Sequence, residues 1–353
     1  MSFPTRKIGQ TEVSAIGYGA MGISRFYGEI TQTDEERFAV RTFPTVLDAV
    51  YANGCKFIDT SDAYGDNEEL IGKWLKRAGN RADLFIATKF GVTEAGANFF
   101  GPDAEPARAI DGRPEYVHAA VQKSLARLGV DCIDLFYAHR VDPLEPIENT
   151  VGAMAELVKA GKVKYLGLSE CSAATLRRAH AVHPIAALQV EYSPFTLDIE
   201  DPKVALLQTA RELGVTIVAY APLGRGLLTG RFKSPDDFGE GDFRKLLPRY
   251  SHENFPNILK LAAGLNDIGT QHGATAGQVS LAWLLAQGDD VIPIPGTRSI
   301  KYLQENLGAA KIQLTPEDLL EVRKEAEIAD VALDGSHYPV GAEASRFGDT
   351  PEL

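Results

Sequence analysis

The sequence predicts an α/β fold: one (β/α)8 TIM barrel with an N-terminal hairpin and long loops at its C-terminal face. Short, near-continuously apolar runs alternate repeatedly with amphipathic stretches of helical period, which is typical of parallel strands covered by helices. At 353 residues the chain is long enough for two average domains, but no linker interrupts the alternation and barrels reach this length. We expect a single domain over residues 1–353, with the barrel at about 13–310 and a C-terminal helix and tail at 315–353.

Eight apolar runs rich in β-branched residues predict the strands, and the stretches between them predict the helices. The strands are expected at Val13–Gly19, Lys56–Thr60, Leu84–Lys89, Cys132–His139, Val163–Ser169, Ala186–Glu191, Val215–Tyr220 and Val291–Pro295. The helices are expected at Asn67–Ala78, Pro114–Leu128, Pro146–Ala160, Ser172–His180, Pro202–Leu213, Thr275–Gln287 and Ser299–Leu307. Glycines that suit the left-handed residue after a helix come at Gly54, Gly79, Gly129, Gly161 and Gly214.

Three segments depart from this regular pattern. Arg6–Val13, with Gly9-Gln10 near its middle, predicts a short hairpin before the first strand. Pro44 interrupts the first helical stretch, so we expect that helix to start or kink near Phe43. The tail from about Asp330 has weak periodicity.

Two connections are longer than an ordinary barrel loop. Thr93–Arg113 follows the third predicted strand, and Leu223–Asn257 follows the seventh. Both leave the C-terminal ends of strands, where barrel enzymes build their active sites. Aromatic residues near this rim are candidates for the substrate pocket: Phe26, Tyr27, Phe99, Phe100 and Tyr137.

Composition excludes several classes of protein. Hydrophobic residues make up 44% and charged residues 24% of the chain, which is ordinary for a globular protein. A net charge of −12 argues against a nucleic-acid-coating surface. The sequence shows no signal peptide, no membrane-spanning run and no metal-ligand spacing, and its three cysteines are far apart. We therefore expect a cytoplasmic protein with reduced thiols, no bound metal, and no membrane or obligate protein partner.

The segment Gly17-Tyr18-Gly19-Ala20-Met21-Gly22 matches the dinucleotide-binding pattern G-x-G-x-x-G. A Rossmann fold would also need a helix opening inside that loop and an acidic residue about 20 residues further on. The following residues indicate no clear helix, and Asp59 comes about 40 residues later. We therefore reject the Rossmann interpretation and expect these glycines to let the backbone approach a ligand at the mouth of the first strand.

Four polar residues fall at the C-terminal ends of successive predicted strands. Asp59 ends the second strand, Tyr64 follows five residues later, Lys89 ends the third strand and His139 ends the fourth. Taken one at a time, each of these residues is more often a solvated or structural side chain than a catalytic one. Because the ends of parallel strands share one rim of a barrel, all four are expected to converge on one pocket.

Proton transfer to an alkoxide is the chemistry that this set favours. Free tyrosine has a pKa of about 10, and a buried ammonium such as Lys89 is expected to lower the pKa of Tyr64. Asp59 would keep Lys89 charged, because an unpaired buried ammonium tends to lose its proton. His139 would orient a carbonyl oxygen. The hydride must come from a cofactor, because no side chain supplies one.

Nearly the whole chain resembles the aldo-keto reductase superfamily, and within it the perakine reductase-like members. Seven segments carry the resemblance: Phe57–Gly65 (FIDTSDAYG), Ala87–Gly91 (ATKFG), Asp134–Pro143 (DLFYAHRVDP), Gly167–Ser169, Ala187–Ser193 (ALQVEYS), Tyr220–Gly226 (YAPLGRG) and Ile292–Asn306 (IPIPGTRSIKYLQEN). The resemblance implies a reductase of small aldehydes or ketones that uses NADPH. It makes Tyr64 the proton donor, Asp59 and Lys89 its tuning pair, and His139 the substrate-orienting residue.

The resemblance also implies an extended NADPH site. Tyr220 would stack on the nicotinamide, Ser169 and Gln189 would hold its carboxamide, and Arg298 is the natural partner for a 2′-phosphate. Glu170 stands where many members have asparagine. The full set of expected cofactor-binding residues is Gly19, Met21, Asp59, Ser169, Gln189, Tyr220, Pro222, Leu223, Gly224, Arg225, Gly226, Leu227, Gly296, Thr297, Arg298, Tyr302, Glu305 and Asn306.

An alternative function on the same fold is an NADPH-binding regulatory module that resembles potassium-channel β subunits. The sequence shows no exposed basic or amphipathic docking segment, and it retains all four catalytic residue types. A reductase is therefore the leading hypothesis.

Overall fold

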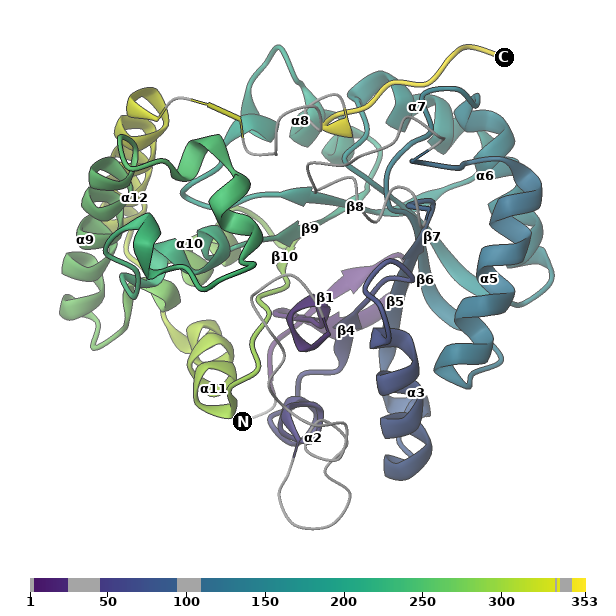
Figure 1. Ribbon diagram of the computed structural model, residues 1–353, viewed down its shortest axis with the longest axis horizontal. Coiled ribbons are helices and arrows are strands. Elements are labelled where there is room, and N and C mark those ends of the chain that lie inside the picture. Colours follow the sequence, from purple (N-terminus) through teal and green to yellow (C-terminus); the bar gives the residue numbers. More distant parts are fainter. Residues whose placement is uncertain (1–2, 25–44, 94–108, 334, 337–344) are drawn as a thin grey trace.

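A computed structural model describes residues 3–24, 45–93, 109–333, 335–336 and 345–353. Its centre is a ring of eight parallel strands, which confirms the predicted (β/α)8 barrel (Figure 1). The strands are β3 (Tyr18–Gly19), β4 (Phe57–Asp59), β5 (Phe85–Phe90), β6 (Ile133–Ala138), β7 (Val163–Ser169), β8 (Ile185–Glu191), β9 (Thr216–Tyr220) and β10 (Val291–Pro293).

The barrel closes where its first and last strands meet. The amide of Gly17 donates to the carbonyl of Pro293 at 2.9 Å, and that of Gly19 donates to Pro295 at 3.3 Å. A side chain would not fit at this seam, because a Cβ on Gly17 would lie 2.6 Å from the Phe57 ring and one on Gly19 would lie 2.6 Å from the carbonyl oxygen of Ile294. Gly17 therefore serves barrel closure rather than a ligand, which corrects our expectation for that residue.

A hairpin covers the N-terminal end of the barrel. Strands β1 (Thr5–Ile8) and β2 (Thr11–Ser14) pair antiparallel, and Gly9 takes a positive φ of 57° at the turn. Arg6 donates to the backbone carbonyl of Val291 in β10 and to that of Leu285, near the end of the helix Ala276–Ala286. The hairpin is confirmed, but the predicted first strand is wrong in its length, because its opening residues belong to β2 and only Tyr18–Gly19 joins the barrel.

The helices surround the ring of strands (Figure 1). They are α2 (Val46–Ala52), α3 (Asn67–Ala78), α5 (Pro114–Leu128), α6 (Ile147–Lys159), α7 (Ala173–Val182), α8 (Leu206–Glu212), α9 (Phe255–Gln271), α10 (Ala276–Ala286), α11 (Ile300–Gly308) and α12 (Pro316–Ala332). Short 3₁₀ turns lie at Met21–Ile23, Arg81–Asp83, Asp198–Glu200, Gly224–Thr229, Pro235–Asp237, Phe243–Leu246, Pro248–Tyr250 and Ala309–Lys311. The five glycines expected to end helices all have positive φ.

Three helices differ from the sequence prediction. Helix α2 begins after Thr45, whose hydroxyl and backbone form a capping box with Asp48, while Phe43 lies outside the described residues. Helix α8 is shorter than predicted, because Ala205 adopts a left-handed φ of 51°. Helix α9 was not predicted.

The apolar core has two layers. One fills the barrel and includes Phe57, Phe85, Leu135 and Tyr137, and the larger one lies between the strands and the helices. Tyr137 is fully buried in the inner layer and does not line the pocket described below, so it is not a pocket aromatic. The other candidate aromatics, Phe26, Tyr27, Phe99 and Phe100, lie outside the described residues, as does most of Thr93–Arg113.

The end of the chain returns to the C-terminal face of the barrel. Gly348 pairs with Cys171, just after β7, and the last residues run beside α7 (Figure 1). Within the described part of the chain, no helix combines the length and apolar character needed to cross a membrane.

Candidate active site

A cavity of about 760 Å³ opens at the C-terminal ends of the strands. Asp59, Tyr64 and His139 line it, and Lys89 lies directly behind Asp59, fully buried. The structure therefore brings together the four residues that the sequence placed on successive strand ends. Parallel strands present their carboxyl ends at one rim, which is why residues up to 80 positions apart meet here.

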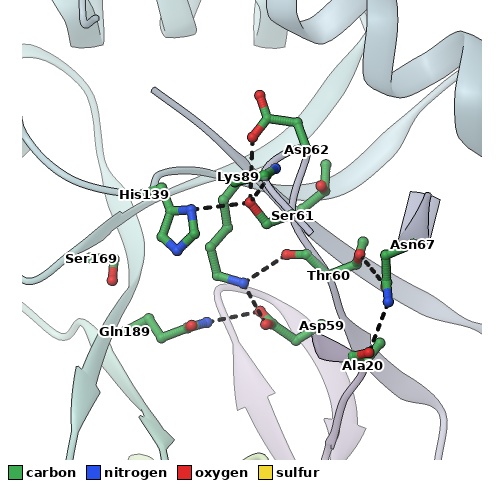
Figure 2. A network of polar contacts seen from close by, with 12 residues as sticks. Ala20, Asp59, Thr60, Ser61, Asp62, Asn67, Lys89, His139, Ser169 and Gln189 are labelled. Atoms are coloured by element: carbon green, nitrogen blue, oxygen red, sulfur yellow. Dashed lines mark hydrogen bonds and ion pairs between the residues drawn. The ribbon is translucent and has the colours of Figure 1, made fainter. Parts of the chain in front are cut away.

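A buried ion pair is the centre of the site. Lys89 Nζ donates to Asp59 Oδ1 at 2.5 Å and to the carbonyl of Thr60 at 2.7 Å (Figure 2). Burial alone would lower the pKa of Lys89, but the charge of Asp59 and the hydrogen bonds with Asp59 and Tyr64 outweigh it and raise that pKa above its ordinary value. Lys89 therefore stays an ammonium.

Tyr64 is hydrogen bonded to Lys89, and the ammonium lies 5.0 Å from the centre of its ring. Burial raises the pKa of Tyr64 above its ordinary value, Lys89 works against that rise, and Asp59 adds to it. Our expectation of a lowered pKa for Tyr64 is thus wrong. The physical reason is that Asp59 offsets the charge of Lys89, so that the cost of burying a phenolate prevails.

His139 follows β6 and its ring meets the Tyr64 ring edge to face, with centroids 5.7 Å apart. Burial, followed by the positive charges of Lys89 and Arg140, lowers the pKa of His139 well below its ordinary value. The imidazole is therefore neutral. One of its nitrogens, Nδ1, lies 3.0 Å from the hydroxyl of Ser61.

Several residues of the site were not singled out from the sequence. Ser61 and Asp62 contact each other behind His139, and Arg140 donates to the carbonyl of His139 at 2.7 Å and to Ser169 Oγ at 3.3 Å. Gln189, which the sequence did single out for the cofactor, makes an additional contact: its Nε2 donates to Asp59 Oδ2 at 2.8 Å. All of these positions lie within the motifs quoted above, but only the folded chain shows which of them touch.

The remainder of the cavity runs along the loop after β9 and the segment after β10. Most of the residues expected to bind a cofactor line it: Gly19, Met21, Asp59, Ser169, Gln189, Tyr220, Pro222, Leu223, Arg225, Gly226, Gly296, Thr297, Arg298, Tyr302, Glu305 and Asn306. Gly224 and Leu227 are buried beside the loop and do not line the cavity. Leu227 belongs instead to the outer core layer.

Local backbone geometry shapes this loop. Ala221, directly after β9, has a φ of 48°, and Gly224, Arg225 and Gly226 follow with φ of 55°, 54° and 96°. Left-handed conformations at consecutive residues turn the chain sharply and bring backbone amides together, which favours anion binding.

Arginines supply positive charge along the same wall. Arg225 pairs with Glu191 at 3.1 Å and Arg244 pairs with Asp242 at 2.6 Å. Arg244 also packs on the rings of Phe232 and Phe238, which the sequence analysis did not identify. Together with Arg231 and Arg298 they face the cavity, so its far end suits a phosphorylated ligand.

Comparisons with known proteins agree with this arrangement. The model of the Aldo/keto reductase family matches residues 15–327. Aldo-keto reductase str7 of Strobilurus tenacellus is 60% identical, covering 100% of this chain and 99% of that protein. The NADP(+) aldo-keto reductase yakc of Schizosaccharomyces pombe is 49% identical, with coverage of 100% and 99%.

Solved structures show the same fold. The thermostable aldo-keto reductase Tm1743, in complex with the inhibitor epalrestat, has a TM-score of 0.70 and 30% identity, covering 92% of this chain and all of that one. The glycerol dehydrogenase AKR11B4 of Gluconobacter oxydans has a TM-score of 0.78 and 26% identity, with coverage of 92% and 95%. The chain belongs to the aldo/keto reductase family, whose members are oxidoreductases of carbonyl and alcohol groups.

Proposed function

We propose that this protein reduces a small aldehyde or ketone to the alcohol with NADPH, using Tyr64 as the proton donor. The observation that carries the proposal is the single buried network in which Asp59, Lys89 and Tyr64 are hydrogen bonded beside the neutral ring of His139. Within the family, the motifs quoted above support membership of the perakine reductase-like group.

The cavity fits NADPH on the chemistry of its walls. Buried amide and hydroxyl groups of Gln189 and Ser169 lie at the catalytic end, and arginines line the far end. Tyr220 would stack on the nicotinamide and Arg298 would bind the 2′-phosphate. The loop Pro222–Leu227 would hold the pyrophosphate through its cavity-lining residues Pro222, Leu223, Arg225 and Gly226. Gly19, Met21, Gly296, Thr297, Tyr302, Glu305 and Asn306 would complete the contacts.

When bound, NADPH supplies the hydride. The residues of this chain bind the carbonyl oxygen and supply its proton. Tyr64 remains a phenol because burial raises its pKa, so it can donate to the oxygen. Lys89 lies within hydrogen-bonding contact and stabilises the phenolate left behind, while Asp59 holds Lys89 in place. His139 provides a second contact that orients the carbonyl.

We further propose that residues 1–353 form one domain that works in the cytoplasm, without a metal or an obligate protein partner. The continuous strand-helix alternation supports the single domain, and free thiols at Cys55, Cys132 and Cys171 support a reducing compartment. Within the described residues, no group of three or more His, Cys, Asp or Glu side chains is placed to hold a metal ion.

A direct assay tests the proposed reaction. The purified protein is mixed with NADPH and a panel of aldehydes and ketones, and the absorbance of the reduced nicotinamide is followed. We expect this absorbance to fall with at least one carbonyl compound. When NADH replaces NADPH, we expect the absorbance to fall more slowly. Tight NADPH binding without turnover of any compound would instead favour the regulatory module.

A further inference from the structure

A chain of three side chains runs behind the active site. The Nδ1 atom of His139 lies 3.0 Å from Ser61 Oγ, and Ser61 Oγ lies 3.4 Å from Asp62 Oδ1 (Figure 2). The amide of Ala63 donates to Ser61 Oγ at 3.2 Å. Asp62 itself is fixed by its backbone, whose amide donates to the carbonyl of Lys89 at 3.1 Å. The proposed function uses neither Ser61 nor Asp62.

The hydroxyl of Ser61 has one hydrogen and two neighbours that can accept it. If Asp62 is a carboxylate, it takes this hydrogen, and Nδ1 of His139 must then donate to Ser61. If Asp62 is protonated, it can donate to Ser61, which leaves the Ser61 hydrogen for Nδ1. A neutral imidazole carries one proton, so the partner of Nδ1 decides what Nε2 presents to the cavity.

We propose that Ser61 and Asp62 are positioning residues that set the tautomer of His139. With a proton on Asp62, Nε2 presents an N–H that donates to a carbonyl oxygen. With Asp62 ionised, Nε2 presents a lone pair, which suits the O–H of an alcohol substrate instead. The inference rests on the proposed function, because it assigns His139 the contact with the substrate oxygen.

The charges of the described residues around His139 support a neutral imidazole that has only two tautomers to choose between. Tyr64 meets its ring edge to face, and burial, followed by the positive charges of Lys89 and Arg140, lowers the pKa of His139 well below its ordinary value. The imidazole therefore stays neutral in the working pH range. Only the position of its single proton is left to be decided, and Ser61 is the neighbour of Nδ1.

Asp62 titrates in a range where activity can be measured. Burial and the charge of Glu68 raise the pKa of Asp62 to about 8, against the opposing effects of Arg127, Ser61 and the Ala63 amide. Tyr64 and Lys89 have pKa values raised above their ordinary alkaline values, so neither titrates near that pH. A change in rate near the pKa of Asp62 is thereby separable from loss of the proton donor.

Nitrogen NMR of histidine-labelled protein with bound NADP⁺ reports the tautomer directly. The His139 signals are assigned by their loss in His139→Gln. We expect the proton on Nε2 below the pKa of Asp62 and on Nδ1 above it. In Asp62→Asn, the side-chain amide can always donate to Ser61, so the proton should stay on Nε2 across the titration. A proton on Nδ1 throughout in the wild type would overturn the proposal.

Kinetics supply the second readout. In the wild type, kcat/KM for carbonyl reduction is expected to fall about tenfold per pH unit above the pKa of Asp62, toward a plateau about 100-fold lower. Asp62→Asn and Ser61→Ala should abolish this step, whereas Ser61→Thr, which keeps the hydroxyl, should retain it. Glu69→Gln on the exposed face of α3 is the matched carboxylate control and should behave as wild type.

The two proposals fail in different ways. If the wild type turns over no carbonyl compound, the proposed function fails, while the NMR titration still measures the tautomer. If the wild type is active but the fall above the pKa of Asp62 persists in Asp62→Asn and Ser61→Ala, the relay is refuted and the reductase assignment stands. Unchanged NADPH binding, and a melting temperature no lower than that of the wild type, exclude misfolding of the variants.

Discussion

Gln189 Nε2 donates a hydrogen bond of 2.8 Å to Asp59 Oδ2, while Lys89 binds the other carboxylate oxygen at 2.5 Å. Both oxygens of Asp59 are thus engaged, one toward the proposed nicotinamide site on β8 and one toward the proton donor. The carboxylate therefore couples two functions, since a shift of Asp59 would disturb the cofactor-side amide and the ammonium together.

Loss of that carboxylate should destabilise the protein. Asp59→Asn leaves the Lys89 ammonium buried without a counter-charge, and breaking a buried pair in this way costs about 3–5 kcal/mol. Denaturant unfolding measures the loss. The double variant Asp59→Asn with Lys89→Met should be less destabilised than the sum of the single variants, because no uncompensated charge remains. Equal unfolding midpoints for wild type and Asp59→Asn would contradict the buried pair.

The hydroxyl of Tyr64, rather than its ring, should carry the reaction. Tyr64→Phe keeps the edge-to-face contact with His139 but removes the group that bonds to Lys89. We expect turnover to fall by at least about 10²–10⁴-fold, while NADPH affinity stays nearly unchanged. Tyr165→Phe, at the hairpin end of the barrel, is the control and should remain active. Full activity in Tyr64→Phe would end its assignment as the proton donor.

Arg298 should discriminate between the two nicotinamide cofactors. A charge-assisted hydrogen bond to a 2′-phosphate is worth about 1.5–3 kcal/mol, so Arg298→Met should raise KM for NADPH by about ten- to hundredfold. KM for NADH should hardly change, because NADH lacks that phosphate. Lys301→Met, an exposed cation on α11, is the matched control. Equal effects on both cofactors would place Arg298 away from the phosphate.

Asp62 should make the protein less stable as the pH rises. Its pKa in the folded state is about 8, above the unfolded value near 3.8, so the folded state binds more protons between these values. Stability is therefore highest below the unfolded pKa and falls up to the folded pKa, by at most about 1.4 kcal/mol per pH unit. Asp62→Asn should stabilise the protein increasingly over this range. A constant difference in melting temperature at all pH values would rule out the raised pKa.

The C-terminal residues should stabilise the cofactor side of the barrel. Gly348 exchanges backbone hydrogen bonds of 2.8 and 2.9 Å with Glu170 and Ser172, next to Ser169, and Arg178 donates to the carbonyl of Thr350 at 2.9 Å. Deleting residues 345–353 should lower the melting temperature, by about 1–2 °C per kcal/mol lost, and weaken NADPH binding. Deleting only the exposed Glu352 and Leu353 should change neither.

The regular part of the fold could be predicted from local patterns. Helices α3 and α5 have the bounds that the sequence indicated, because each is an amphipathic stretch with a proline or acidic residues in its first turn and a glycine directly after its last residue. Helix α8 shows the limit of that reasoning. A left-handed φ at Ala205 shortens it, and alanine has no local preference for that conformation.

For the site, the sequence by itself determined which residue types stand at the strand ends, and hence that Asp59, Lys89 and His139 share a rim. Only the tertiary structure decided the contacts among them: Gln189 on Asp59, Ser61 on His139, and the burial that raises rather than lowers the pKa of Tyr64. The physical reason is that the positions of the strands along the chain follow from local periodicity. Hydrogen-bond partners and desolvation depend instead on how closely side chains from distant strands pack against one another.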